Sequence, residues 1–170
     1  IPETVARATA RACSLGAKLL TVHVAGGRAM MEAAVRAART AGGDTRLLGI
    51  TVLTSLDESD LRETGVTAGS VESVVLDRAR LARESGLDGV VASPREAQPI
   101  RRQAPPEFAV VTPGIRPAGG AEGDQKRIAT PRSAVAAGAD WIVVGRPIRD
   151  AADPRAMAEA IIADLQGISG

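Results

Sequence analysis

The sequence is poor in cysteine, histidine and lysine, and these shortages exclude several kinds of site. Cys13 is the only cysteine in 170 residues, which excludes an internal disulfide and a cysteine-based metal cluster and fits a reducing cytoplasm. His23 is the only histidine, so no pair of histidines exists to bind a metal. The basic residues are nearly all arginine, and Lys18 and Lys126 are the only lysines. We therefore expect no metal site built on these residue types.

Long apolar runs and a strong net charge are also missing. No run approaches the ~20 apolar residues that cross a bilayer, and the first residues lack a basic segment followed by an apolar stretch. A formal net charge of +1 gives no long-range field that would attract nucleic acid or an anionic membrane. We expect a cytoplasmic protein whose partner is a small molecule held by a local site, with neither nucleic acid nor membrane as a partner.

Apolar runs alternate with helix-like segments along the chain. The 45% apolar and 24% charged content is ordinary for one soluble domain, here residues 1–170. Helices are predicted where Ala, Arg, Glu and Leu dominate, at 4–15, 28–40, 71–85, 95–102, 131–137 and 153–165. Strands are predicted at the aliphatic runs 19–24, 47–53, 89–92, 108–112 and 141–144. Because these runs do not alternate with polar residues, we expect a parallel α/β sheet covered by helices on both faces.

Glycine patterns narrow the choice of α/β fold. Glycine recurs between helix and strand in the segments 16–18, 86–88 and 138–140, where a left-handed residue can end a helix. No Gly-x-Gly-x-x-Gly follows a predicted strand and no Walker-type Gly-Lys-Ser/Thr occurs, so nucleotide-cofactor folds lose support. Five strands could form a doubly wound sheet or part of an eight-stranded TIM barrel, and the polar or glycine-rich loops directly after strands favour the barrel, which usually needs ~250 residues. We therefore predict a partial barrel of about five β/α units.

The strongest local signal follows the last predicted strand, where Gly145 and Arg146 precede a proline and a helix. Glycine lets an anion approach the backbone, and arginine offers a two-pronged donor to phosphate oxygens. In barrels the loops after the last two strands commonly form the phosphate site. The alternative is a solvated surface arginine beside a turn, and spacing alone does not decide between them.

One strand earlier, a long loop carries a second set of anion-binding residue types. Residues 112–117 read Thr-Pro-Gly-Ile-Arg-Pro, and a Gly/Ala-rich stretch leads to Gly123, Asp124 and Gln125. Two prolines stiffen the turn, and the glycines leave a lid that could fold over a ligand. Arg116 and Gln125 would then reach the same phosphate as Arg146. A plain long loop is the alternative, although loops of this length in compact domains are more often functional.

Two further polar residues stand at or near strand ends. Thr54 follows the second strand and is placed to offer a hydroxyl and an amide at the barrel mouth, although Ser and Thr also cap helices ahead of acidic turns such as the one at residues 57–58. His23 lies within an apolar strand, where a histidine is more often packed than catalytic. Lys18, Asp88 and Asp140 all precede strands, at the wrong end for barrel chemistry.

Taken together, these segments resemble the orotidine 5′-phosphate decarboxylase family. The resemblance rests on the order and spacing of five segments, which cover essentially the whole chain: Ile-Pro-Glu-Thr at 1–4, Thr-Val-Leu-Thr-Ser at 51–55, Gly-Ile-Arg-Pro at 114–117, Gly-Asp-Gln-Lys-Arg at 123–127 and Gly-Arg-Pro-Ile at 145–148. It implies a (β/α)8 barrel that converts orotidine 5′-monophosphate to UMP and CO2 without metal or organic cofactor. It also implies a homodimer with active sites at the subunit interface.

The resemblance also implies residue roles. Arg116, Gln125, Gly145 and Arg146 match residues that hold the phosphate, and Thr54 matches a contact of the pyrimidine. Thr4 matches a threonine near the ribose in the neighbouring subunit's site. In the family a segment of the form Asp-x-Lys-x-x-Asp, which supplies the proton-donating lysine, precedes Ile-Pro, and this sequence starts just after that point. We therefore assign no catalytic residue and expect the 170-residue chain alone to be inactive.

Two other functions stay open at this stage. Another phosphosugar barrel, such as a keto-gulonate-phosphate decarboxylase or a hexulose-phosphate synthase, shares the phosphate loops but needs metal-binding carboxylates, for which we find no candidates. A non-catalytic phosphate-binding module is the third possibility. The segments at 114–117 and 123–127 favour the pyrimidine enzyme.

Overall fold

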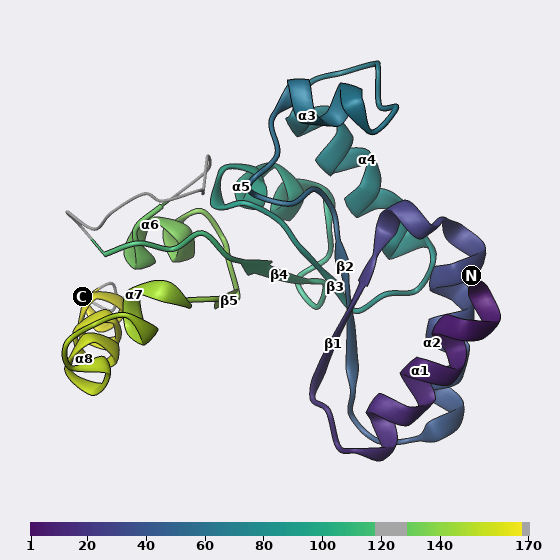
Figure 1. The fold of residues 1–170 in the computed structure, drawn as a ribbon, viewed down its shortest axis with the longest axis horizontal. Coiled ribbons are helices and arrows are strands. Elements are labelled where there is room, and N and C mark those ends of the chain that lie inside the picture. Colours follow the sequence, from purple (N-terminus) through teal and green to yellow (C-terminus); the bar gives the residue numbers. More distant parts are fainter. Residues whose placement is uncertain (118–128, 168–170) are drawn as a thin grey trace.

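The computed structural model describes residues 1–117 and 129–167 and shows five parallel strands with helices on their outer side (Figure 1). The strands pair in the order of the chain, so each strand lies beside the one that follows it. Their bounds are β1 (Leu19–His23), β2 (Arg46–Ile50), β3 (Gly89–Val91), β4 (Ala109–Thr112) and β5 (Trp141–Ile142). A sheet in strict chain order with every pair parallel is the arrangement of a β/α barrel, so the prediction of a partial barrel of about five units is confirmed.

Helices connect the strands, and polar residues begin most of them. Ser70, Ser93, Thr130 and Asp153 each accept a hydrogen bond from a backbone N–H in the first turn of their helix. The helices are α1 (Pro2–Ser14), α2 (Arg28–Ala41), α3 (Glu58–Glu63), α4 (Val71–Glu84), α5 (Pro94–Gln103), α6 (Pro131–Ala136), α7 (Arg146–Arg149) and α8 (Pro154–Gln166), with a 3-10 turn η1 (Val24–Gly26) after β1. The α1 and α2 helices lie at one end of the molecule and α7 and α8 at the other (Figure 1).

Gly16, Gly86 and Gly138 end the turns that lead into β1, β3 and β5, as the repeated glycine predicted. All three have positive φ, of 77°, 85° and 99°. A side chain would strain the backbone in this left-handed conformation, so glycine is needed there. The recurrence in the sequence therefore reflects a recurring unit of the fold.

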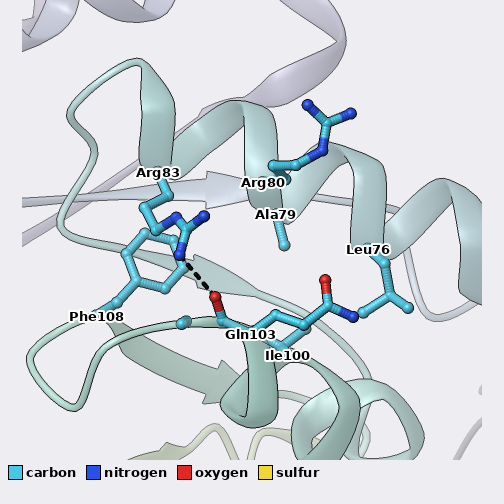
Figure 2. A pocket seen from close by; sticks show the side chains of 8 residues that line it. Leu76, Ala79, Arg80, Arg83, Ile100, Gln103 and Phe108 are labelled. Atoms are coloured by element: carbon cyan, nitrogen blue, oxygen red, sulfur yellow. Dashed lines mark hydrogen bonds between the residues drawn. The ribbon is translucent and has the colours of Figure 1, made fainter.

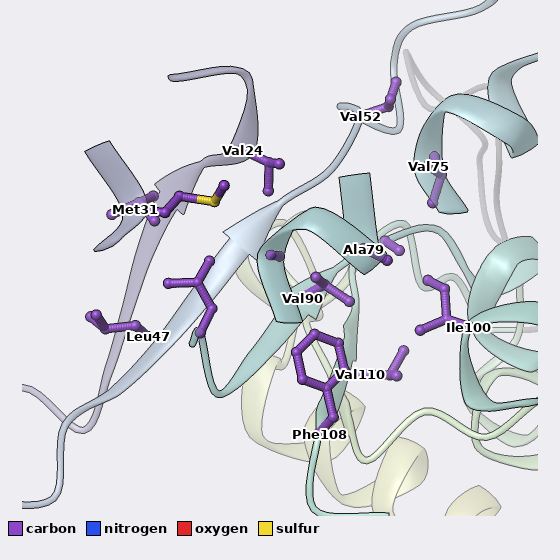
Figure 3. Packing of buried hydrophobic residues seen from close by; sticks show 14 of the residues in the cluster. Val24, Met31, Leu47, Val52, Val75, Ala79, Val90, Ile100, Phe108 and Val110 are labelled. Carbon is purple, nitrogen blue, oxygen red and sulfur yellow. The ribbon is translucent and has the colours of Figure 1, made fainter. Parts of the chain in front are cut away.

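The main core lies between the outer face of the sheet and the helices (Figure 3). Leu47, Val90 and Val110 project from three neighbouring strands and are fully buried against residues such as Met31 and Ile100. A second, smaller cluster of Leu48, Val91, Ala109 and Val111 lies on the opposite, inner face of the same strands. Each fully buried aliphatic side chain of this size contributes about 1.5–3 kcal/mol, so the central strands are the most stable part of the sheet.

The expectation that helices cover both faces of the sheet is wrong, because among the described residues the helices pack on the outer face, and at the two outer strands the inner face is exposed (Figure 1). Leu19 on β1 and Trp141 on β5 are 44% and 39% exposed, and both belong to the inner face. Their exposure follows from position, because β1 and β5 each pair with one strand among the described residues. On this inner face the Arg46 guanidinium of β2 lies 5.5 Å from the ring centre of Trp141 on β5.

Several predicted boundaries differ from the structure. The second strand ends at Ile50 rather than 53, because the Thr51 N–H and hydroxyl both donate to the Val91 carbonyl and close the pairing with β3. The helices α3 and α7 were not predicted, since α3 contains one apolar residue, Leu61, and α7 has only four residues, so neither gives a periodic apolar pattern. Asp57, and not Thr54, caps α3, through a reciprocal pair of hydrogen bonds with Asp60.

Candidate ligand-binding site

The carboxyl ends of the five strands form one rim of the sheet, and most of the predicted site residues follow that rim. Parallel pairing places the ends of all strands on the same side, so the segments after β1, β2, β4 and β5 start from neighbouring points. Barrel enzymes carry their chemistry at this end.

The loop after β4 holds Arg116 in a buried position. The Arg116 N–H donates to the Ala129 carbonyl at 2.9 Å and the Ala129 N–H donates to Gly114, so the two ends of the long loop are tied together. Ile115 packs with Ala134 and Ala139. The Arg116 residue is only 8% exposed, and its Nη1 donates to the Ile115 carbonyl at 2.8 Å. A guanidinium held this firmly has little rotational freedom left to lose when it binds an anion.

The loop after β5 brings Gly145 and Arg146 to the same rim. Gly145 is the N-cap residue of α7, and Arg146 is the first residue of that helix. A Cβ atom built at Gly145 would meet no atom within 4 Å. The next arginine of this helix, Arg149, donates two hydrogen bonds to Asp150, which together with the charge of Arg146 hold the pKa of Asp150 below its usual value. Arg149 is thus paired with a carboxylate, while Arg146 is half-buried at the start of the helix.

Arg116 and Arg146 occupy equivalent places in two adjacent units. Thr112 and Ile142 are register partners at the ends of β4 and β5, and the Val143 N–H continues the pairing by donating to Thr112. Arg116 is the fourth residue after Thr112, and Arg146 is the fourth residue after Ile142. Adjacent strands are about 4.8 Å apart, so the two loops leave the sheet side by side.

Thr54 lies after β2, in a segment that is anchored to its neighbours. The Arg78 guanidinium of α4 donates to the Thr51 carbonyl at 2.6 Å, and Thr51 itself is bonded to β3. Thr54 is 7% exposed. The structure thus places Thr54 near the carboxyl rim, as the sequence predicted, but with its side chain largely covered.

Thr4 and His23 line one pocket at the outer edge of β1. The pocket has a volume of about 400 Å3 and is lined by residues of α1, β1 and the first turn of α2. The prediction that His23 is packed within the strand is wrong, because its side chain is exposed at the end of an edge strand. Sequence reasoning missed this because the run around it is apolar, and only the edge position of β1 reveals the difference.

Gln125 lies outside the described residues, as do Gly123, Asp124 and Lys126 of the predicted lid. Its place relative to the two arginines therefore stays a prediction. The described ends of the lid, at Pro117 and Ala129, lie beside Arg116.

Asp88, Asp140 and Lys18 lie at the opposite rim, before their strands, and each has a hydrogen-bond or ion-pair partner there. Asp88 accepts from the Leu47 N–H and from Arg39, both at 2.7 Å, and Asp140 accepts in the same way from the Val110 N–H and from Arg101. Lys18 forms an ion pair with Asp44 at 2.7 Å, which lowers the pKa of Asp44. These hydrogen bonds and ion pairs join neighbouring strands at the amino-terminal rim.

The cavity between α4 and α5 is not a ligand site (Figure 2). Its volume of about 20 Å3 holds no more than one water molecule. Phe108, directly before β4, and the bond from Arg83 to the Gln103 carbonyl place it at the amino-terminal rim. No group of three His, Cys, Asp or Glu side chains able to hold a metal occurs among residues 1–117 and 129–167. Within the same ranges no helix has the length and apolarity needed to cross a membrane.

The fold and site together define a β/α-barrel protein with paired arginines in the loops after two adjacent strands. Comparison with known proteins assigns the family: residues 1–161 match the model of the Orotidine 5′-phosphate decarboxylase / HUMPS family. The chain belongs to this family. The resemblance found in the sequence is confirmed.

Individual relatives agree with this assignment. The chain is 53% identical to the orotidine 5′-phosphate decarboxylase of Anaeromyxobacter sp. (strain K) over 165 residues, which are 97% of this chain and 71% of that protein. It is 49% identical to the enzyme of the same name from Moorella thermoacetica over 172 residues, covering 98% and 68% of the two chains. Among solved structures, the orotidine 5′-phosphate decarboxylase from Lactobacillus acidophilus superimposes with a TM-score of 0.84 at 36% identity, covering 97% and 70%.

Proposed function

We propose that this chain forms the phosphate- and pyrimidine-binding part of an orotidine 5′-phosphate decarboxylase, which converts orotidine 5′-monophosphate to UMP and CO2 in pyrimidine biosynthesis. In this proposal Arg116, Gln125, Gly145 and Arg146 hold the phosphate, and Thr54 contacts the pyrimidine. Family membership supports the reaction. The observation that carries the site is the equivalent spacing of Arg116 and Arg146 after register partners on β4 and β5.

In orotidine 5′-monophosphate the phosphate is far from the ring carbon that loses CO2. Tight binding of the phosphate can therefore assist the reaction only by positioning the rest of the substrate. Binding energy from a remote group can hold the substrate in a strained or desolvated position at the reacting centre. Arginine suits this task because its planar guanidinium donates two parallel hydrogen bonds to a phosphate and stays charged at every physiological pH. Gly145 supports it by leaving open space beside the backbone.

Lys18, the lysine within the described residues, is not placed to donate the proton that replaces CO2 on the pyrimidine ring. Lys18 lies at the amino-terminal rim and is paired with Asp44, away from the strand ends that carry the arginines. We therefore expect the purified 170-residue chain to bind UMP without decarboxylating orotidine 5′-monophosphate. Formation of UMP above the uncatalysed rate by this polypeptide would contradict the expectation.

Calorimetry tests the proposal with three ligands added to the 170-residue chain: UMP, AMP and inorganic phosphate. We expect UMP to bind about tenfold or more tightly than AMP, because the pyrimidine loop at Thr54 discriminates between the bases, and inorganic phosphate to bind most weakly. Equal affinity for UMP and AMP would favour a general phosphate-binding module instead. Failure to bind any of the three would contradict the proposed site.

We also propose that the protein acts in the cytoplasm as a homodimer with Thr4 near the ribose of the neighbouring subunit's site. The exposure of Thr4 at the start of α1, next to the carboxyl rim, supports such a role. Sedimentation equilibrium with and without UMP tests it. A monomer at all concentrations, with UMP affinity unchanged in Thr4→Val, would contradict the shared site.

A further inference from the structure

We propose that Arg78 of α4 is a positioning residue of the pyrimidine loop, residues 51–54, and sets the affinity for the base through the Thr54 hydroxyl; the inference rests on the proposed function. Arg78 lies outside the binding loops and does not contact the ligand in this proposal. It acts on the main chain of the loop, through its hydrogen bond to the Thr51 carbonyl. Three features of the structure support this role.

The Thr51 carbonyl is bonded by Arg78 in place of a neighbouring strand. The Thr51 N–H donates to the Val91 carbonyl and closes the pairing of β2 with β3. Regular parallel pairing would next bring the Ser93 N–H to the Thr51 carbonyl, but Ser93 is already the N-cap residue of α5. The Arg78 Nη1 donates to this carbonyl instead, at 2.6 Å. Thr51 is 2% exposed, so loss of Arg78 would leave its carbonyl with little access to water and no replacement donor from β3.

The charge of Arg78 is not explained by ion pairing on the helix surface. Arg80, two residues further along α4, pairs with Asp77 and Glu84. Arg78 is half-buried and forms no ion pair with a residue that the structure describes. Burial lowers the pKa of its guanidinium below the usual value. A partly buried charge without a counter-charge is unfavourable for folding, and perturbed groups of this kind cluster at functional sites.

The bond from Arg78 lies at the carboxyl rim, directly before the segment that carries Thr54. The α4 helix joins two parallel strands and therefore runs back from this rim, and side chains on a helix lean toward its N-terminus, so Arg78 reaches toward the rim. Between Thr51 and Thr54, Val52 is buried in the outer core. With Thr51 held by Arg78 and Val52 held by packing, the main chain approaches Thr54 along a fixed path. Such support matters because a binding group must stay within about 0.5 Å of its productive position.

Arg83 provides a matched control, because it makes the same kind of bond at the opposite rim. It lies on the same helix, and its Nη1 donates to the Gln103 carbonyl at 2.6 Å (Figure 2). Arg78→Met and Arg83→Met each remove one bond from a guanidinium to a carbonyl and keep an unbranched side chain. Both should lower the melting temperature by a few degrees. In calorimetry on the 170-residue chain, only Arg78→Met should weaken UMP binding, by about tenfold, while inorganic phosphate binds to both variants as to wild type.

Three further measurements separate positioning from a general loss of stability. Arg78→Lys keeps an N–H donor for the Thr51 carbonyl and should recover UMP affinity to within about threefold of wild type. In a double-mutant cycle with Thr54→Val, Arg78→Met should weaken UMP binding further by less than about twofold, because its effect passes through Thr54. The ratio of UMP to AMP affinity should fall in Arg78→Met for the same reason and stay at the wild-type value in Arg83→Met.

The outcomes separate this inference from the proposed function. Equal losses of UMP affinity in Arg78→Met and Arg83→Met, or additive losses in the cycle with Thr54→Val, would assign the effect to stability alone and overturn the inference. Unchanged UMP affinity in Arg78→Met or in Thr54→Val, with Arg116→Ala still weakening it, would also overturn the inference and leave the phosphate site standing. If the wild-type chain does not bind UMP, both the proposed function and the inference fail.

Discussion

The two rims of the sheet contain similar charged residues in different surroundings. At the amino-terminal rim, Asp88 and Asp140 each bind a strand N–H and an arginine at once, so their charges hold neighbouring strands in register. At the carboxyl-terminal rim, Arg116 and Arg146 stand in loops after strands, and Arg116 is positioned in part by a main-chain carbonyl. The comparison teaches that charged residues at the amino-terminal rim join neighbouring strands, while the two arginines at the carboxyl-terminal rim stand in loops beyond the strand ends, where we propose that they bind a phosphate.

The largest effect should come from Arg116→Ala. Loss of a charge-assisted pair of hydrogen bonds to phosphate is expected to weaken UMP binding roughly 100-fold, about 2–3 kcal/mol. Arg116→Lys should restore little of it, because an ammonium group lacks the planar fork. The control is Arg149→Ala, whose guanidinium is paired with Asp150 and whose loss should leave affinity unchanged. Calorimetry measures the UMP affinity of all three variants. Equal losses of affinity in Arg116→Ala and Arg149→Ala would contradict the specific role of Arg116.

Replacing Asp88 or Asp140, which join neighbouring strands at the amino-terminal rim, should lower stability and leave UMP affinity unchanged. Asp88→Ala and Asp140→Ala are each expected to lower the free energy of unfolding by about 1–2 kcal/mol, because a strand N–H and an arginine lose their acceptor. Both carboxylates are partly exposed, so water replaces some of the lost interaction. Urea unfolding gives the stability and calorimetry the UMP affinity. Weakened UMP binding in a variant that remains folded would mean that the two rims are not separate in function.

Two glycine substitutions, one at each rim, should distinguish an effect on stability from an effect on UMP affinity. Gly138→Ala, at a φ of 99° before β5, should destabilise the fold by about 1–2 kcal/mol without altering the ligand site. Gly145→Ala meets no atom within 4 Å, so its cost in stability should be smaller, but its methyl group stands where the phosphate approaches and should weaken UMP binding several-fold. Urea unfolding and calorimetry on both variants check the pair. A larger loss of affinity in Gly138→Ala than in Gly145→Ala would contradict it.

The smallest effect should come from Asp44→Asn, because the ion pair with Lys18 is largely exposed. Stability near neutral pH should stay within measurement error. The hydrogen bond from Lys18 lowers the pKa of Asp44 below its ordinary 3.8. Its contribution is therefore present above that pH and is lost as the pH falls through the lowered pKa. In urea unfolding between pH 2 and pH 7, any small advantage of the wild type over Asp44→Asn should therefore be found above about pH 3.8 and should disappear at the acid end.

Much of the fold could be predicted from local patterns. The five strands and six of the eight described α-helices were placed within a few residues, because apolar runs, capping residues and glycine turns act over short stretches of chain. The failures also have local causes. The α3 helix has one apolar residue and α7 has four residues in all, so neither gives a periodic signal, and the end of β2 depends on Thr51 bonding to another strand.

The candidate site was only partly predictable. Arg116, Arg146 and Thr54 follow strands in the sequence, and any parallel sheet places such residues on one rim. His23 was misjudged because its surroundings depend on whether β1 is an edge strand and on which face it presents. Neither property can be calculated from the residues around position 23.

The sequence by itself determined the β/α rhythm, the glycine turns and the residue types of the phosphate loops, since these depend on backbone conformation and on neighbours along the chain. The tertiary structure decided which residues meet. Pairing of Thr112 with Ile142 sets the two arginine loops side by side, and the assembled sheet places Arg46 against Trp141 on its inner face. Such contacts join residues 30 or more positions apart and depend on the packing of the whole sheet, so no local pattern contains them.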